Sequence, residues 1–239
     1  MNLLIACEES QEVCKAFRAK GHNAFSCDIQ DCSGGHPEWH IKGDVLPLLN
    51  PDVVNRPDCQ YFGFYFETCD GIHHKIEGKW DMIIAHPPCT YLTNAANRYY
   101  NVSNYGLSAL VRLARREFAS DFFMAFVNCD CEKKVIENPI GVMSSLFRKP
   151  DQIIQPYYFG HPYRKSTCLW LFNVPLLVPT AIVDFEVIHS KGKSGGYSGY
   201  SWVVRDVNGK VLPYSHPLVS KLRSKTFPGV AAAMADQWG

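Results

Sequence analysis

The sequence predicts an α/β protein with a doubly wound, mostly parallel sheet of the Rossmann-like type, helices on both faces, and a small irregular C-terminal region. Two observations indicate this fold. Short apolar, strand-like segments alternate with helical ones, and several of these strands end in a polar or acidic residue. Because parallel strands present their carboxyl ends at one edge of a sheet, these residues are expected to line a common ligand crevice.

A strand–helix–strand unit opens the chain. Residues 2–7 form an apolar strand, and residues 10–21 show the apolar stripe of a helix with Ser10 as its N-cap. The next strand, residues 22–29, ends in Asp28. A parallel unit of this kind is half of a doubly wound sheet.

Two further apolar strands flank the strongest helical pattern, which covers residues 107–127. The strand before this helix runs through Ile83 and stops at two prolines followed by Cys89, because proline cannot donate a hydrogen bond to a sheet. The strand after it, in residues 133–141, ends in Glu137-Asn138-Pro139. Cys89 and Glu137 are therefore expected at the same edge of the sheet.

The composition is that of a globular protein with one main domain. Of the 239 residues, 46% are hydrophobic and 20% charged, and no apolar run approaches the roughly 18 residues of a membrane span. The sequence begins directly with a strand and shows no secretion signal, so we expect a cytoplasmic protein whose ten cysteines are mostly reduced. These features argue against a membrane protein and against a secreted, disulfide-linked one.

The net charge of +1 hides an uneven distribution. Residues 1–140 carry 13 lysines and arginines against 18 acidic residues, whereas residues 141–239 carry 11 against 5. The basic C-terminal part either lies against phosphate groups or presents an ordinary solvated face.

The most specific motif lies around Cys89. Residues 88–96, Pro-Cys-Thr-Tyr-Leu-Thr-Asn-Ala-Ala, resemble the catalytic loop of C5-cytosine-specific DNA methyltransferases, whose pattern is P-C-Q-x-F-S-x-A-G. The family's E-N-V signature resembles Glu137-Asn138-Pro139, and its G-D-I element resembles Gly43-Asp44-Val45. The chain is thus similar to a short form of this family without a full target-recognition domain. The resemblance implies an S-adenosylmethionine-dependent methyltransferase fold.

The resemblance also implies a covalent mechanism. Cys89 would add as a thiolate to C6 of cytosine, Glu137 would hydrogen-bond to or protonate N3, and Asn138 would brace the loop. Neighbouring backbone N–H groups and cations can lower the pKa of a thiol such as Cys89, and Glu137 is useful as an acid only if its pocket raises its pKa toward the working pH. From the residues alone, an inert buried thiol and an ordinary surface carboxylate stay open as alternatives.

A basic segment, residues 159–171, is similar to the family's G-V-P-Q-x-R-x-R strand. Lys165 stands where the first arginine is found, and Arg164 is out of register by one. Because a one-residue shift on a strand turns a side chain to the opposite face, Lys165 is the better candidate for the catalytic cation beside the base.

The implied cofactor is S-adenosyl-L-methionine. Asp28 would accept hydrogen bonds from ribose hydroxyls, although a turn-capping role is also open for it. The family's glycine-rich turn is replaced here by Cys-Glu-Glu-Ser at residues 7–10, so Ser10 and the helix N-terminus are expected to contact the methionine part. The predicted cofactor residues are Ala6, Ser10, Asp28, Ile29, Asp44, Val45, Pro87 and Thr226.

The implied macromolecular partner is DNA, with no membrane contact. A catalytic and cofactor-binding core is expected at residues 1–172 with an insertion at about 51–79, a short recognition-like region at 173–220, and a terminal segment at 221–239 that returns to the core. Residues 191–202 are rich in glycine and serine and are predicted to be a loop. The predicted DNA contacts are Thr93, Asn94, Arg98, Arg164, Lys191, Lys193, Arg205, Lys221, Arg223 and Lys225.

Two clusters of cysteine and histidine have the residue types of a metal site. One comprises Cys27, Cys32, His36 and His40, and the other Cys59, Cys69, His73 and His74. Neither contains the C-x2-C pairing typical of zinc sites, so no metal is predicted.

The sequence therefore predicts a DNA (cytosine-5-)-methyltransferase. Two alternatives remain. Modification of cytosine in free nucleotides is favoured by the missing recognition domain. A methyltransferase-fold protein that binds without turnover is favoured by the altered first turn and the lost arginines.

Overall fold

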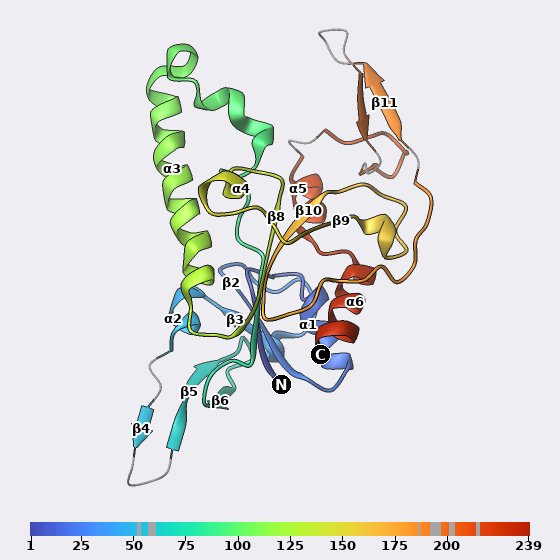
Figure 1. Cartoon of the computed structure of the whole chain (residues 1–239). Helices are drawn as coiled ribbons and strands as arrows, with labels where there is room; N and C mark the ends of the chain where they lie inside the picture. Colours follow the sequence, from blue (N-terminus) through green and yellow to red (C-terminus); the bar gives the residue numbers. More distant parts are fainter. Residues whose placement is uncertain (52–53, 57–60, 186, 192–196, 201–203, 214–215) are drawn as a thin grey trace.

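The computed structural model describes residues 1–51, 54–56, 61–185, 187–191, 197–200, 204–213 and 216–239. A seven-stranded sheet forms its centre (Figure 1). Its order is β3 (His40–Lys42), β2 (Asn23–Asp28), β1 (Asn2–Ala6), β7 (Met82–Ala85), β8 (Lys133–Pro139), β10 (Thr167–Phe172) and β9 (Gln152–Ile154).

Within this sheet, β10 runs antiparallel to both of its neighbours, and the pairs from β3 to β8 are parallel. This order with its reversed strand is that of the Rossmann-like methyltransferase fold. The predicted fold class is therefore confirmed.

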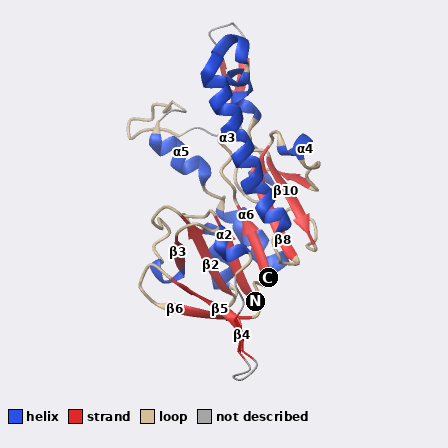
Figure 2. Cartoon of the chain, turned by 90° about the vertical axis from the view of Figure 1, so that its left-hand side faces the viewer, coloured by secondary structure: helices blue, strands red, loops and turns tan. Residues whose placement is uncertain are grey.

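Helices cover both faces of the sheet (Figures 1 and 2). On one face, α1 (Glu12–Ala19) and α6 (Pro228–Trp238) pack together over Leu3 and Ile5. On the other, α3 (Val102–Asn128) and α2 (Leu46–Leu49) lie over Leu4 and Ala6. Successive strand residues point to opposite faces, and a strand buried on both faces needs the continuous apolar run that β1 shows.

The start of α1 differs from the prediction. Ser10 is not the N-cap, because the helix begins at Glu12 and Gln11 occupies the cap position with φ of 58° and no side-chain capping bond. The first turn is instead capped by the buried Glu8 carboxylate, which accepts hydrogen bonds from the N–H groups of Val13 (2.7 Å) and Cys14 (3.1 Å).

The sheet has a step at the edge where the strands end. Strand β7 stops at Ala85, which pairs with Ile136, whereas β8 continues beside β10 to the pair of Pro139 with Thr167. Glu137 is thus the first residue of β8 that projects beyond β7.

A second, three-stranded antiparallel sheet lies between α2 and β7 in the sequence. It consists of β4 (Val54–Arg56), β5 (Tyr61–Glu67) and β6 (His73–Glu77). Phe64 of this sheet packs on Trp80, and Phe66 packs on Phe25, with ring centroids 5.2 and 4.9 Å apart. The small sheet therefore extends the core on the α3 face.

The predicted loop at residues 191–202 is wrong for residues 197–200. These form β12 (Tyr197–Tyr200), which pairs antiparallel with β11 (Ile188–Lys191). The tyrosines and Ile188 favour strands, and the prediction gave more weight to the glycines and serines. In Figure 1 this hairpin and α3 extend beyond the same end of the central sheet.

Helix α3 begins earlier than predicted, at Val102, where the Asn101 side chain caps it by accepting from the Asn104 N–H (3.1 Å). It is kinked at Gly106, whose φ of 51° is accessible to glycine at little cost. The shorter elements are η1 (Pro37–Trp39), η2 (Asn94–Tyr100), α4 (Met143–Leu146), η3 (Pro156–Tyr158) and α5 (Pro217–Ser224). Within the described residues, no helix has the length and apolar character needed to cross a membrane.

Candidate active site

Cys89 lies on an exposed loop that leaves the carboxyl end of β7. Two contacts fix this loop to β8 and the residues after it. The Asn138 side chain, which is buried, donates from Nδ2 to the Pro87 carbonyl oxygen (2.7 Å). Further on, the Leu92 carbonyl oxygen accepts from the Val142 N–H (2.8 Å). Asn138 therefore sits where bracing was predicted.

Gly141 makes this attachment possible. A β-carbon at this position would lie 2.1 Å from the Leu92 carbonyl oxygen and 3.1 Å from the Thr93 α-carbon. Both neighbours are backbone atoms, so they cannot move aside as a flexible side chain would. The Cys89 loop thus depends on a glycine that no sequence pattern singles out.

Glu137, at the step of the sheet, is bound to His86, the residue that precedes the two prolines. Their Oε2 and Nδ1 atoms are 3.2 Å apart. Burial alone would raise the pKa of Glu137, but the His86 hydrogen bond and the charge of Lys165 outweigh it, so the pKa is lowered. The condition of a raised pKa, under which Glu137 alone would be an effective acid, is not met in the free protein.

The thiol of Cys89 also differs from expectation. Although the residue as a whole is exposed, burial around its sulfur and the negative charge of Glu137 raise the thiol pKa. Lys165 and Arg223 act in the opposite direction without outweighing these causes. Glu137 and Lys165 are thus both close enough to Cys89 to influence its ionisation.

Lys165 lies in the loop before β10, not on a strand, so the face argument that selected it does not apply. Its Nζ donates to the Arg223 carbonyl oxygen (2.8 Å). Arg164 instead places its guanidinium 5.4 Å from the centre of the Phe185 ring. A small cavity beside Lys165 is lined by Glu137, Ile154, Pro156, Thr167, Thr226, Phe227, Val230 and Met234.

Glu8 is a member of this region that sequence reasoning missed. Burial raises its pKa to about 7, while His86 and the N–H groups of α1 oppose the rise. Nothing in the sequence distinguishes Glu8 from its neighbour Glu9. Only the fold shows that its carboxylate lies beneath the start of α1.

The pH dependence of the free energy of unfolding should reveal the raised pKa of Glu8. Because the pKa of Glu8 is about 7 in the fold and 4.5 in the unfolded chain, its contribution is fully present below pH 4.5 and lost as the pH rises through 7. The shift corresponds to about 3 kcal/mol. We expect the free energy of unfolding from urea titrations to fall less steeply over this window in Glu8→Gln than in the wild type. Glu77→Gln, which removes an exposed carboxylate on β6, should retain the wild-type slope, and a wild-type slope for Glu8→Gln would contradict the assignment.

The predicted cofactor residues gather mainly at the ends of β1, β2 and β3. Burial is the main cause of the raised pKa of Cys7, and the carboxylates of Asp28 and Asp44 raise it further. Because both carboxylates act on Cys7, they lie near one another. Each also has a local role, since Asp28 Oδ1 accepts from the Gln30 N–H (2.9 Å) and Asp44 Oδ1 from the Leu46 N–H (3.0 Å). Ile29 beside them is 75% exposed.

The other predicted cofactor residues are less accessible or more distant in the fold. Ala6, Ser10, Val45 and Pro87 are buried. Thr226 instead lines the cavity that contains Glu137 and Lys165, on the side of β8 and β10. The predicted cofactor residues therefore lie in two separate regions at the carboxyl ends of the central strands.

The first turn reaches its shape without glycine. Cys7 and Gln11 adopt left-handed conformations, with φ of 60° and 58°, which non-glycine residues rarely adopt. A glycine packs on this turn from outside, because a β-carbon on Gly34 would lie 2.6 Å from the Ser10 carbonyl oxygen. The Gln11 side chain joins the two segments, donating to the His36 carbonyl oxygen (2.8 Å) and accepting from its N–H (3.1 Å).

The predicted DNA contacts fall into separate groups. Thr93, Asn94 and Arg98 follow Cys89, while Lys221 and Arg223 lie on α5 with Lys225 directly after it. Arg205 donates to the Gly209 carbonyl oxygen within its own turn (2.8 Å). Lys191 ends β11, and Lys193 lies outside the described residues.

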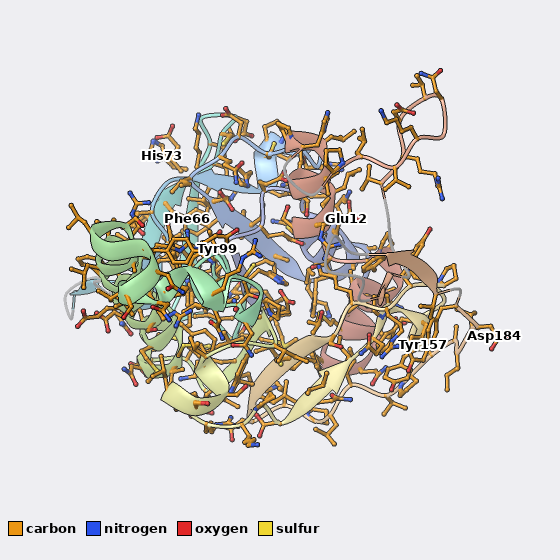
Figure 3. The ribbon with its side chains drawn as sticks, turned by 90° about the horizontal axis from the view of Figure 1, so that it is seen from above. Glu12, Phe66, His73, Tyr99, Tyr157 and Asp184 are labelled. Atoms are coloured by element: carbon orange, nitrogen blue, oxygen red, sulfur yellow. The ribbon has the colours of Figure 1, made fainter. Side chains whose placement is uncertain are left out.

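A further basic surface was missed. Helix α3 carries three arginines that stack on tyrosines of the Cys89 loop and η2. The Arg112 guanidinium lies 5.2 Å from the Tyr100 ring centre and 5.5 Å from that of Tyr91, and Arg115 donates to the Tyr91 hydroxyl (2.8 Å). We call this the Tyr–Arg surface and define it as Tyr91, Tyr99, Tyr100, Tyr105, Arg98, Arg112, Arg115 and Arg116. Tyr99, labelled in Figure 3, marks its position beside α3.

The charges of this surface are unmatched by acids. In the described part of the chain, none of its four arginines forms an ion pair with a carboxylate. Arg112 also has a buried Nε atom that finds no hydrogen-bond partner among the residues that the structure describes. A hollow beside it is lined by Tyr99, Tyr105, Leu107, Ser108, Val111, Arg112 and Arg115. The helical spacing of the arginines was visible in the sequence, but the tyrosines that meet them come from another segment.

The cysteine and histidine clusters do not form a metal site in the part of the chain that is described, where no group of three or more potential ligands comes together. Cys59 lies outside that part.

Comparison with known proteins gives limited information. No protein-family model matches the sequence, and no curated protein matches it. Among solved structures, the chain is similar to that of a candidate DNA modification methyltransferase encoded within a prophage of E. coli, with 13% identity and a TM-score of 0.46. The similarity covers 77% of this chain and 52% of that one, so the chain spans about half the length of its structural neighbour.

Proposed function

We propose that this chain is an S-adenosylmethionine-dependent methyltransferase that modifies C5 of cytosine in DNA through a covalent bond between Cys89 and C6. The observation that carries the proposal is the placement of a thiol and a carboxyl group at the ends of adjacent parallel strands. Cys89 follows β7, Glu137 projects from β8 beside it, and Lys165 acts electrostatically on both. Addition of a nucleophile to cytosine needs such a pair, one group for C6 and one for N3.

The residues of the site would have the following roles in the reaction. Lys165 and Arg223 favour the Cys89 thiolate, and bringing their charges closer as DNA binds would offset the causes that keep the thiol protonated. Glu137 would hydrogen-bond to N3 of an extruded cytosine. Asn138 holds the loop through Pro87 and so fixes the distance between the two groups.

The strand ends also suit the cofactor. Asp28 and Asp44 each have a second carboxylate oxygen with no hydrogen-bond partner among the described residues, available to ribose hydroxyls and to an adenine amino group. The exposed Ile29 would cover an aromatic ring. When bound, S-adenosylmethionine supplies an electrophilic methyl group.

DNA is favoured over a free nucleotide by the Tyr–Arg surface. It continues directly from the Cys89 loop, since Tyr91 is two residues from Cys89 and its carbonyl oxygen accepts from Arg116 Nε (3.0 Å) and from the Tyr100 hydroxyl (3.0 Å). Guanidinium groups without acidic partners attract phosphates, and tyrosine rings stack on bases. A single nucleotide in the Cys89 site would leave most of this surface unused.

Removing two of these arginines should weaken DNA binding. For Arg112→Gln with Arg115→Gln, we expect about a tenfold loss of affinity at low salt and a decrease of about 2 in the slope of log affinity against log salt, measured by fluorescence anisotropy. The control is Lys75→Gln with Lys79→Gln, which removes two exposed charges on and beside β6. Equal salt slopes for the two double variants would show that the Tyr–Arg surface does not contact DNA.

The proposed function is tested by supplying the purified chain with methyl-labelled S-adenosylmethionine and either DNA or deoxycytidine triphosphate. Label should enter DNA, and sequence-resolved detection should find it at C5 of cytosine. Label in the nucleotide alone would establish the free-nucleotide enzyme. Cofactor binding by calorimetry without transfer to either substrate, and without capture of a 5-fluorocytosine duplex, would establish a binding protein.

A further inference from the structure

His86 occupies an unusual position between two carboxylates. Its side chain is 9% exposed, and its Nδ1 lies 3.2 Å from Glu137 Oε2. Its other ring nitrogen, Nε2, is buried and has no hydrogen-bond partner among the described residues. The ring is therefore held from one side only, by Glu137.

Three charged groups from different elements face this ring. They are Glu137 on β8, Glu8 in the turn after β1, and Lys165 in the loop before β10. Both oxygens of Glu8 are engaged by the N–H groups at the start of α1, so Glu8 acts on His86 through its charge. Burial lowers the pKa of His86, but the bond to Glu137 and the two carboxylate charges prevail over burial and Lys165, and the pKa is raised.

These contacts favour a proton on His86 over one on Glu137. The lowered pKa of Glu137 keeps its carboxyl group ionised at neutral pH. An ionised carboxylate accepts hydrogen bonds but has no proton for N3 of cytosine. The proposed reaction therefore needs a donor behind Glu137, and His86 is hydrogen-bonded to it.

We propose that His86 supplies the proton that Glu137 delivers to N3, passing it from Nδ1 to Glu137 Oε2 as the base is attacked. This rests on the proposed function. As the bond from Cys89 Sγ to C6 forms, the electrons of the C5–C6 double bond shift toward C4, and those of the C4–N3 double bond move to N3, which takes the proton. The adduct breaks down once C5 carries the methyl group. The hydrogen of C5 then leaves as a proton to water, the electrons of that C–H bond re-form the C5–C6 double bond, and the Sγ–C6 bond breaks with its electrons returning to the Cys89 thiolate. N3 returns its proton through Glu137 to His86, and the C4–N3 double bond is restored. His86 acts through Glu137 and is thus a positioning residue.

The pairing can be tested without any methyl transfer. The ring signals of His86 in the free protein are followed by NMR from pH 5 to 9. We expect His86 to titrate above the ordinary histidine value and Glu137→Gln to lower its pKa. A His86 pKa that does not respond to Glu137→Gln overturns the proposal, whether or not the chain modifies DNA.

The role in turnover is tested with His86→Asn. Its side-chain amide can donate to Glu137 as Nδ1 does but carries no ionisable proton. We expect kcat to fall about 100-fold with KM for DNA changed by no more than about twofold. The fall in kcat that the wild type shows above the pKa of His86 should also disappear. His73→Asn is the control, with wild-type kcat and profile.

Wild-type kcat and an unchanged pH profile in His86→Asn would overturn the inference and leave the proposed function standing. If the wild type transfers no methyl group to DNA, the proposed function fails, and the NMR titration still decides whether His86 and Glu137 share a proton. If His86→Asn does not fold, the NMR titration still decides whether His86 and Glu137 share a proton.

Discussion

Cys89→Ser is expected to abolish transfer of the methyl group to DNA, with a loss of about 1,000-fold or more in kcat. A hydroxyl group has a far higher pKa than a thiol and is a much weaker nucleophile toward C6. The size and shape of the side chain are preserved, and the loop is held by Pro87 and Leu92, not by the sulfur. The melting temperature should therefore stay at the wild-type value.

The measurement is incorporation of labelled methyl groups into DNA, together with mass spectrometry of the complex with a 5-fluorocytosine duplex. Cys69→Ser, at another exposed cysteine, is the matched control and should form the covalent complex as the wild type does. Transfer by Cys89→Ser at a rate near that of the wild type would show that another group performs the chemistry.

Gly141→Ala is expected to lower both stability and activity. The added methyl group would meet the Leu92 carbonyl oxygen at 2.1 Å, so the Cys89 loop or the segment after β8 must shift. Overpacking of this kind costs about 1–3 kcal/mol. In a chain of this size the melting temperature falls by about 2–4 °C for each kcal/mol.

Activity should fall further than the lost stability explains, because the shift moves Cys89 relative to Glu137. The control is Gly43→Ala, where a β-carbon meets no atom within 4 Å, and its melting temperature should be close to that of the wild type. A melting temperature of Gly141→Ala equal to that of Gly43→Ala would show that the loop is not tied to this glycine.

The sequence predicts the central sheet well because its signals are local and repeated. The strand that ends in Asp28 and the strand that carries Glu137 are apolar runs with polar ends, and the parallel topology brings those ends to one edge. The same logic brings Cys89 near Glu137. A few kinds of local pattern thus suffice to predict the strands whose carboxyl ends carry the site residues.

The contacts that set ionisation are not local. His86 precedes two prolines, and nothing in its neighbourhood shows that its ring meets a carboxylate 51 residues away. Glu8 is an ordinary turn residue in the sequence and becomes a buried cap only when α1 lies over it. The directions of the Cys89 and Glu137 pKa shifts could therefore not be predicted. They depend on how deeply each group is buried and on the charges and hydrogen bonds around it, and only the tertiary structure determines these.

The cavity wall formed by Thr226 and Phe227 has a consequence for truncated variants. These residues border Glu137, and α6 directly after them packs on α1 in the apolar cluster that contains Leu3 and Ile5. A variant shortened to residues 1–210 therefore loses one wall of the cavity and uncovers apolar side chains of β1. A binding or activity assay on such a fragment would report the loss of α6 and not a property of the strand ends.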